Sequence, residues 1–177
     1  MVALAEALGA HGFDVVRFNF PYREKGSNRP DPMPVLKAAI GSVAARVRDA
    51  KPGKLVIGGR SMGGRAASML AADGFDCDGL LLLAYPLHPA GQPEKLRDAH
   101  LRRIEVPVLC FNGTRDALCR RDLMEQAISG LHGWQMHWLE GADHSFRVLK
   151  SSVRSDAGVL EEVGAASGRW LDAVVTV

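Results

Sequence analysis

Apolar residues gather in five short runs along the chain, and each run predicts a β-strand. The runs are Phe13–Phe18, Leu55–Gly58, Gly79–Ala84, Val106–Phe111 and Gln135–Leu139. Several of them are unbroken rather than alternating, which is typical of strands that are covered on both faces of a sheet. Apolar residues at helical spacing predict helices around these runs, at Val2–Ala10, Val35–Ala50, Gly63–Ala72, Arg121–Ser129 and Gly158–Val175.

The alternation of strands and helices predicts an α/β fold with a doubly wound, mostly parallel sheet and helices on both of its faces. The 177 residues are enough for a substantial core, and we expect a single domain over residues 1–177 with no separate lid domain. In sheets of this kind, ligands bind beyond the carboxyl ends of the strands. The chemistry is therefore expected in the segments that directly follow the strands.

A candidate nucleophile follows the second run. Gly59-Arg60-Ser61-Met62-Gly63 is a G-x-S-x-G pattern between an apolar run and a helix rich in small residues. This order predicts a nucleophile elbow, in which a tight turn holds the Ser61 hydroxyl clear of the sheet. We expect that Gly59 and Gly63 are glycines because only small residues fit two places either side of the serine. At a helix N-terminus, backbone N–H groups favour a developing negative charge on the bound group.

An acid and a histidine follow the later strands in the order of a catalytic triad. Asp116 follows the fourth run and His144 follows the fifth. Serine, then acid, then histidine is the order found in α/β-hydrolases. In that interpretation His144 takes the Ser61 proton and returns it to the leaving group, while Asp116 holds the imidazole tautomer. The Met62 N–H is expected to be one oxyanion donor.

Each of these assignments has a plainer alternative. Asp116 could cap a turn, and Asp143 is a rival acid, although a residue next to the histidine in a loop usually points elsewhere. His144 could be a loop histidine. The other histidines are interpreted as structural or solvated, and they are His11, His88, His100, His132 and His137. Cys110 is interpreted as a core residue of a strand and Cys119 as a surface thiol.

Other chemistries lack their motifs. Gly58–Gly64 contains no G-x-G-x-x-G fingerprint for a dinucleotide, and Arg65-Ala66 stands where a phosphate loop needs Lys followed by Ser or Thr. No group of histidines, cysteines or carboxylates has the spacing of a zinc site. We therefore expect that the protein uses no metal and no cofactor.

Composition limits the partners and the compartment. The chain is 47% hydrophobic and 24% charged with a net charge of +2, so we expect neither nucleic acid nor a membrane as a partner. No apolar run approaches the roughly 20 residues that a membrane span needs. Three unclustered cysteines and the lack of a signal-peptide pattern favour a cytoplasmic protein. The expected partner is a small acyl ester substrate, and a homodimer is left open.

Two segments are candidates to overhang the nucleophile, namely Pro21–Pro34 and Pro86–Leu101. The first segment is basic, and the candidate substrate-binding residues are Arg60, Tyr22 and Arg23. A basic rim would favour esters that carry a carboxylate or a phosphate. The alternative is a positively charged loop that is only solvated.

Several motifs together resemble a known group of enzymes. They are Phe18-Asn-Phe-Pro-Tyr22, Arg29-Pro-Asp-Pro-Met-Pro34, Gly58-Gly-Arg-Ser-Met-Gly-Gly-Arg65, Tyr85–Arg97, Gly113-Thr-Arg-Asp116 and Gly141-Ala-Asp-His144. Over nearly the whole chain the sequence is similar to small α/β-hydrolases related to dienelactone hydrolase. It is most similar to bacterial proteins that resemble testis-expressed hydrolase-like proteins and the third NSL-complex subunit. The resemblance implies Ser61, Asp116 and His144 as the triad and implies no particular substrate. Dienelactone hydrolases proper carry a cysteine where this chain has Ser61, so their specific activity is not expected.

The resemblance also implies a strand that this sequence does not show. Family members usually begin with a further strand and a His-Gly or Gly-Ala-Gly loop ahead of the first helix, and this loop gives the second oxyanion N–H. The strand would lie between those corresponding to Phe13–Phe18 and Leu55–Gly58. We therefore expect the chain to be shortened at its N-terminus relative to the family, which leaves a gap in the sheet or forces re-pairing.

The sequence thus predicts a serine hydrolase that cleaves small ester or thioester acyl groups through an acyl-enzyme. An acyltransferase or a peptidase would use the same triad. The alternative from another class is a hydrolase-fold protein that binds partners with little catalysis, which the resemblance to a complex subunit permits. The intact triad favours the enzyme, and the missing oxyanion loop favours the binding protein.

Overall fold

A four-stranded parallel sheet forms the centre of the protein in the computed structural model, which describes residues 2–51 and 53–176. Met1, Pro52 and Val177 lie outside the described residues. The strands neighbour one another in chain order, and they are β1 (Val56–Arg60), β2 (Gly79–Leu83), β3 (Val108–Gly113) and β4 (Trp134–Leu139). The predicted α/β fold with a parallel sheet is confirmed.

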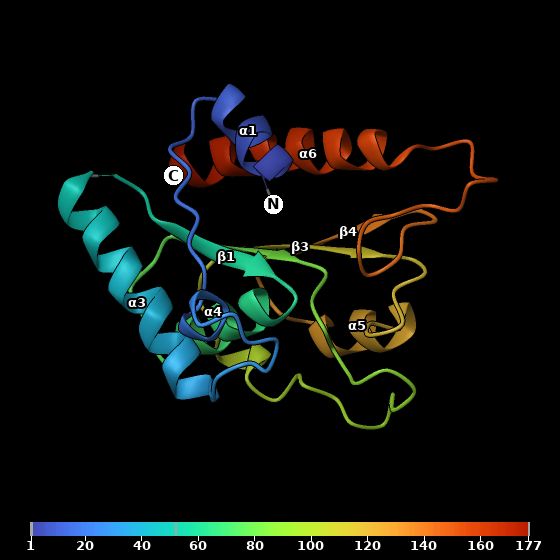
Figure 1. Cartoon of the computed structure of the whole chain (residues 1–177), viewed down its shortest axis with the longest axis horizontal. Coiled ribbons are helices and arrows are strands. Elements are labelled where there is room, and N and C mark those ends of the chain that lie inside the picture. The colour runs from blue at the N-terminus through green and yellow to red at the C-terminus, as the bar shows by residue number, and fades with distance from the viewer. Residues whose placement is uncertain (1, 52, 177) are drawn as a thin grey trace.

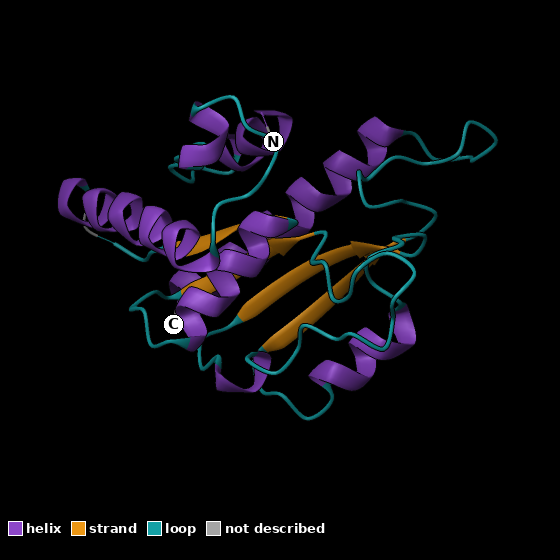
Figure 2. Cartoon of the chain, turned by 60° about the horizontal axis from the view of Figure 1, so that its bottom comes forward, coloured by secondary structure: helices purple, strands orange, loops and turns teal. Residues whose placement is uncertain are grey.

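Helices cover both faces of this sheet (Figures 1 and 2). One face carries α3 (Met33–Ala50), α4 (Met62–Ala72), α5 (Arg121–Ile128) and the 3-10 turn η1 (Leu101–Arg103), which contacts α4 and α5. The other face carries α1 (Val2–Ala10) and α6 (Asp156–Thr176), which pack on each other, and the short helix α2 (Pro21–Glu24) precedes α3. In the described part of the chain, no helix combines the length and the apolar character that a membrane crossing requires.

The unbroken apolar strands are buried on both faces, as the sequence predicted. Every residue of β2 and β3 is buried. Along β2, Leu80 and Leu82 join the core that contains α3 and α4 residues, whereas Leu81 and Leu83 join the core that contains α1 and α6 residues. Because β2 supplies apolar side chains to two cores, it has no polar face and its sequence does not alternate.

The predicted strand at Phe13–Phe18 is wrong, because these residues form an extended loop. Its first residue donates a hydrogen bond to Leu8 O at the end of α1, at 3.4 Å, and Val16 in the middle of the segment is 57% exposed. β1 is one of the two edge strands, and no described strand lies between it and this segment. An apolar run becomes a strand only where a neighbouring strand pairs with it, which sequence propensity does not specify.

A buried polar pair anchors α4 to the segment ahead of η1. His100 is 7% exposed, and its Nε2 lies 2.8 Å from Oγ of Ser68, which is fully buried in α4. Burial, together with the charges of Arg65 and Arg103, lowers the pKa of His100 from 6.5 to about 4. The folded protein therefore keeps this imidazole neutral in mildly acidic solution.

We expect acid to destabilise the fold through His100. The unfolded chain binds a proton at His100 below about pH 6.5, and the folded chain binds it only below about pH 4, so the free energy of unfolding should fall as the pH drops between these values. The loss is at most about 3 kcal/mol. Urea unfolding across this pH range should show a weaker pH dependence for His100→Gln than for the wild type. Identical profiles would contradict the expectation.

Candidate active site

Ser61 occupies the turn between β1 and α4. Its φ of 52° and ψ of −115° lie in a region that non-glycine residues rarely adopt. The Ser61 N–H donates to Leu83 O on β2 at 2.8 Å, and Ser61 O accepts the N–H of Arg65 in α4 at 3.0 Å. Backbone strain of this kind costs about 1–3 kcal/mol and persists where surrounding bonds hold it. The strand, turn and helix of the expected elbow are therefore present.

In this turn, the backbones of β1 and α4 approach each other most closely at Gly59 and Gly64. A Cβ on Gly59 would lie 2.9 Å from Gly63 C, and a Cβ on Gly64 would lie 2.7 Å from Gly59 O. A Cβ on Gly63 would meet only the Phe20 ring, at 3.8 Å. The expectation that Gly63 is sterically required is therefore wrong. Because α4 begins at Met62, it is Gly64 that faces back onto β1.

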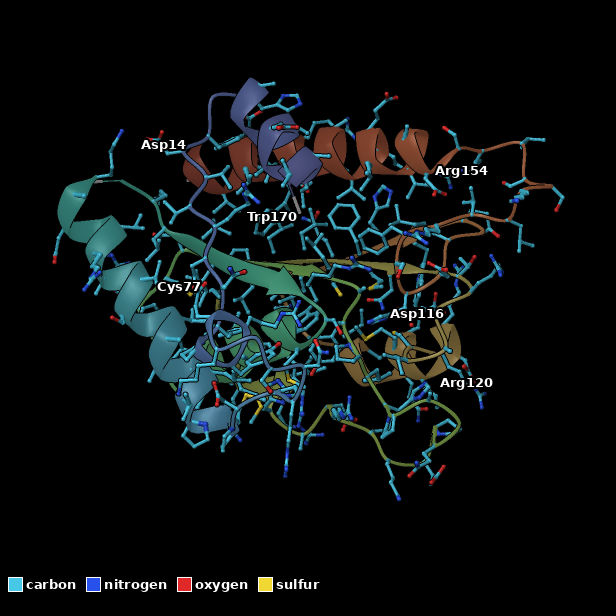
Figure 3. The ribbon with its side chains drawn as sticks, viewed as in Figure 1. Asp14, Cys77, Asp116, Arg120, Arg154 and Trp170 are labelled. Atoms are coloured by element: carbon cyan, nitrogen blue, oxygen red, sulfur yellow. The ribbon has the colours of Figure 1, made fainter. Side chains whose placement is uncertain are left out.

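Three side chains from separate loops meet at the carboxyl ends of the strands. Ser61 Oγ lies 2.9 Å from His144 Nε2, and His144 Nδ1 lies 2.8 Å from Asp116 Oδ2. The Asp116 side chain has 0% exposed surface, whereas the His144 side chain is 27% exposed. Figure 3 shows Asp116 at this end of the sheet, on the side of α5. A hydroxyl, a base and an orienting acid that are hydrogen-bonded in this order can remove the proton from the serine hydroxyl.

The carboxylate of Asp116 is held in one orientation by neighbouring donors. Its Oδ1 accepts the Leu118 N–H at 2.8 Å, and its Oδ2 accepts the Asn112 Nδ2–H at 3.1 Å. A buried carboxylate has only acceptor sites, so these donors and the imidazole N–H satisfy it. The oxygen that faces His144 is therefore fixed before any substrate binds.

The loop that contains His144 is held by hydrogen bonds inside the loop and by a contact with a side chain of β1. Asp143, the rival acid, accepts two backbone N–H groups of its own loop at 2.7 and 3.0 Å. Arg60 donates from its guanidinium to His144 O at 2.8 Å and lies over the Phe146 ring, 5.7 Å from its centroid. Arg60, a candidate substrate contact, is thus engaged by the main chain of the histidine loop.

Sequence analysis missed Asn112, which links the acid to two strands. Asn112 is fully buried near the end of β3, where its Nδ2 donates to Tyr85 O at 3.0 Å and to Asp116. Its Oδ1 accepts the Tyr85 N–H at 3.1 Å. The available signal was a single amide at the end of an otherwise apolar run, because a buried amide must find hydrogen-bond partners.

The segment after Tyr85 supports the acid loop from outside. The His88 N–H donates to Leu118 O at 3.0 Å, and His88 Nε2 accepts the Arg120 N–H at 3.1 Å. Its Nδ1 lies 2.9 Å from Pro89 O, so the proton resides on Nδ1. His88 is therefore structural, as expected. Its contacts show that Pro86–Leu101 braces the loop that presents the acid.

Tyr22 and Arg23, the other candidate substrate contacts, interact within their own segment. The Tyr22 ring stacks on Phe20 with centroids 6.1 Å apart, and Arg23 bonds to Asn28. Phe20 is the residue of this segment that lies beside the elbow, next to Gly63. The structure thus brings an aromatic ring, rather than these two candidates, close to the turn.

Two cysteines near the acid loop are buried and neutral. Cys119 is 2% exposed, so the expected surface thiol is wrong, whereas Cys110 is fully buried in β3 as expected. Burial raises the pKa of both thiols, and a protonated thiol is a poor nucleophile. Across residues 2–51 and 53–176, no group of three or more His, Cys, Asp or Glu is placed to hold a metal ion.

One backbone donor lies next to the nucleophile. α4 begins at Met62, and the first N–H bonded back along the helix is that of Arg65, to Ser61 O. The Met62 N–H therefore has no acceptor within the helix, as at any helix N-terminus. With the positive end of the helix dipole, it can stabilise negative charge on an oxygen bound beside Ser61.

Comparison with known proteins identifies the family. Residues 1–172 match a family model described as an alpha/beta hydrolase domain, so the chain belongs to the α/β hydrolase family. Among solved structures, an alpha-beta serine hydrolase homologue from Coxiella burnetii has a TM-score of 0.74 and 23% identity, over 96% of this chain and 74% of that chain. A lidless serine hydrolase from Xanthomonas campestris has a TM-score of 0.72 and 22% identity, over 96% and 72%. A monoacylglycerol lipase from Paleococcus ferrophilus has a TM-score of 0.70 and 16% identity, over 97% and 88%.

We expect alanine at Gly64 to destabilise the protein, because its Cβ would press against Gly59 O at 2.7 Å. Overpacking of this kind costs about 1–3 kcal/mol. Gly63→Ala is the matched control, since its Cβ has room and alanine favours a helix over glycine by about 1 kcal/mol. Urea unfolding of the two variants measures the difference. Equal stability of the variants would show that α4 does not approach β1 so closely.

Proposed function

We propose that this chain is a serine hydrolase that cleaves small esters or thioesters through an acyl-enzyme. The observation that carries the proposal is the hydrogen-bonded series Ser61, His144 and Asp116, with distances of 2.9 and 2.8 Å. The strained turn at Ser61 and the Met62 N–H, which has no acceptor within α4, support the same assignment. The roles follow from the chemistry of the groups.

His144 Nε2 takes the proton from Ser61 Oγ as this oxygen attacks the acyl carbon. Asp116 keeps the second ring proton on Nδ1 and stabilises the imidazolium, while the Met62 N–H stabilises the oxyanion. His144 then gives the proton to the departing alcohol or thiol. In the second half, His144 deprotonates a water that attacks the acyl-enzyme, and Ser61 leaves as it regains the proton. These groups suffice for the reaction without a cofactor.

The ester substrate is supported by chemistry and by analogy. Two solved structures with the same fold are named a monoacylglycerol lipase and an esterase domain. We also propose a narrower relationship to testis-expressed hydrolase-like proteins and the third NSL-complex subunit, which is supported by the resemblance of the Tyr85–Arg97 segment. The free cysteines Cys77, Cys110 and Cys119 agree with a cytoplasmic location.

One observation favours a second candidate, a binding protein with little catalysis. The outer edge of β1, the strand that leads to Ser61, is paired with no described strand. The resemblance implies a second oxyanion donor from a strand beside β1, and removing one such donor typically lowers kcat by about 10²–10³-fold. Covalent labelling of the serine distinguishes the two candidates.

We expect a fluorophosphonate probe to label the wild type at Ser61. Ser61→Ala should abolish labelling and lower kcat by about 10⁶-fold, and His144→Ala should have a similar effect because the hydroxyl then keeps its proton. Ser145→Ala is the control, since this exposed serine lies in the same loop and should leave labelling unchanged. An unlabelled wild type supports the binding protein. Unchanged labelling of His144→Ala removes His144 from the proposed triad.

We expect anionic esters to have a higher kcat/KM than neutral esters of equal length. Two cations, Lys25 and Arg29, and one carboxylate, Asp31, line an open depression of about 610 Å³ beside α2, which leaves it with a net positive charge. Positive charge there raises the local concentration of anionic substrates, and salt weakens the effect. Lys25→Gln with Arg29→Gln should remove the preference without changing kcat for neutral esters. No preference in the wild type would reject the basic rim.

A further inference from the structure

Two arginines lie close enough to repel each other between α4 and the segment that leads from β2 to η1. Arg65 belongs to the first turns of α4, and Arg97 belongs to that segment. Figure 1 shows the segment, in light green, on the same side of the sheet as α4 and α5. Both side chains are half-buried. Burial, together with the positive charge of Arg65, lowers the pKa of the Arg97 guanidinium.

Hydrogen bonds around Tyr85 hold Arg97 in this place. Tyr85 is fully buried just after β2, and its hydroxyl donates to Arg97 O at 2.7 Å. The Arg97 N–H donates to Leu87 O at 2.8 Å, and Arg97 Nη1 donates to Pro86 O at 3.3 Å. The charges of Arg65 and Arg97 both act on the Tyr85 hydroxyl. The two guanidinium groups therefore share one neighbourhood, beside the end of β2.

The Arg65 side chain has no partner among the residues that the structure describes. Its Nε is buried and has no acceptor, and the guanidinium forms neither an ion pair nor a hydrogen bond with the described residues. Buried donors without acceptors are rare in folded proteins. Arg103, close by, shows the ordinary arrangement, since it donates to Ala72 O at 3.4 Å and pairs with Asp73 at 3.5 Å. Arg65 is thus a guanidinium whose acceptor must come from elsewhere.

The nearest carboxylates do not balance the two arginines. Asp73 is paired with Lys37 and Arg103. Asp98, which follows Arg97 in the chain, acts on His100 but forms no ion pair with any described residue. The space between α4 and residues 86–101 therefore keeps an excess of positive charge.

His100 avoids this repulsion by losing its proton, whereas the arginines cannot. Burial and the charges of Arg65 and Arg103 lower the pKa of His100 to about 4, so its imidazole is neutral at neutral pH. A guanidinium stays protonated at any ordinary pH. Water can accept its N–H groups but carries no charge to offset the repulsion. An anion that bonds to both guanidinium groups does both.

We propose that Arg65 and Arg97 form a binding site for a phosphate or carboxylate group, between α4 and residues 86–101. Guanidinium groups match the oxygens of these anions in paired, planar hydrogen bonds, which a halide ion cannot accept in the same way. Two cations at one site favour a dianion, so phosphate should bind more tightly than acetate.

The position of Arg65 relates this site to the nucleophile. Arg65 follows Ser61 by one helical turn, and its N–H donates to Ser61 O at 3.0 Å. Side chains of a helix tilt toward its N-terminus, so the Arg65 side chain leans toward the Ser61 end of α4. The bound group can therefore belong to a separate ligand or to the ester substrate. Only the second source rests on the proposed hydrolase function.

Titration with inorganic phosphate tests the site. Binding is followed by NMR at the backbone amides and the arginine Nε–H groups, with ionic strength held constant by sodium chloride. We expect saturable shifts at the Arg65 Nε–H and along residues 86–101. Arg65→Met and Arg97→Met should each raise the Kd for phosphate by about 10–100-fold, because a charge-assisted hydrogen bond is lost. Arg65→Lys keeps the charge and should lose less.

Two control variants separate this site from general attraction by positive charge. Arg46→Met removes one exposed cation of α3, and Lys25→Gln with Arg29→Gln removes the cations beside α2. Both should leave the Kd for phosphate unchanged. Shifts that do not saturate, or a Kd that is the same in Arg65→Met as in the wild type, overturn the proposal. An equal loss of affinity in Arg46→Met overturns it in favour of non-specific attraction.

Urea unfolding gives a readout that a purely structural arginine would not produce. Saturating phosphate should raise the unfolding midpoint of the wild type and leave that of Arg65→Met unchanged, because a ligand stabilises only the protein that binds it. Without phosphate, Arg65→Met should be no less stable than the wild type, since the repulsion is gone. A less stable Arg65→Met, with no effect of phosphate on the wild type, shows a structural role and overturns the proposal.

Ester kinetics distinguish the two sources of the anion. If the substrate carries it, phosphate raises the KM of a hemisuccinate ester but not that of the acetate ester of the same alcohol. If the ligand is separate, neither KM changes. Saturable binding that needs Arg65, together with no fluorophosphonate labelling of Ser61, supports the anion site and contradicts the hydrolase. Labelling of Ser61 without phosphate binding supports the hydrolase and contradicts the anion site.

Discussion

The hydrogen bond from the Ser61 N–H to Leu83 O is the constraint on which the site depends. This bond extends the pairing of β1 with β2 by one residue beyond the end of β1. It thereby holds the Ser61 backbone at a φ of 52°, a conformation that an unconstrained backbone rarely adopts. The close approach of Gly59 and Gly64 is a second constraint. The helix α4 can begin at Met62 only because no Cβ at these positions separates α4 from β1. Sheet pairing therefore sets the direction of both the hydroxyl and the helix N-terminus.

His144 and Asp116, the proposed base and acid, are positioned by parts of the chain that are remote from them in sequence. Arg60, next to the nucleophile, bonds to His144 O, so the end of β1 also locates the histidine loop. Asn112 joins Asp116 to the end of β2 through the backbone of Tyr85. The three loops therefore meet at one point, because each is bonded to the carboxyl end of the same parallel sheet. The unpaired edge of β1 leaves this framework open on one side, directly beside the nucleophile.

Local patterns predicted much of this arrangement. Ser61, Asp116 and His144 were identified because each follows a buried strand, and the carboxyl ends of parallel strands share one edge. The same reasoning failed at Phe13–Phe18, where the apolar run is present but no described strand pairs with it. The motif also led us to expect a steric need for glycine at Gly63, whereas the structure shows this need at Gly64. The motif gives the spacing of small residues but does not specify which of them faces β1. Cys119 was misplaced because burial depends on how the acid loop folds back.

The sequence by itself determined the four strands that form the sheet, the longer helices around them, the elbow and the chemical groups that follow the strands. These features depend on periodicity and on residue type over a few neighbouring positions. Only the tertiary structure decided the hydrogen bonds of Asn112, the engagement of Arg60 by the histidine loop and the lack, within the described residues, of an acceptor for Arg65 Nε. Each of these depends on which distant backbone lies within about 3 Å of a donor or acceptor, and that distance is set by the packing of the whole sheet.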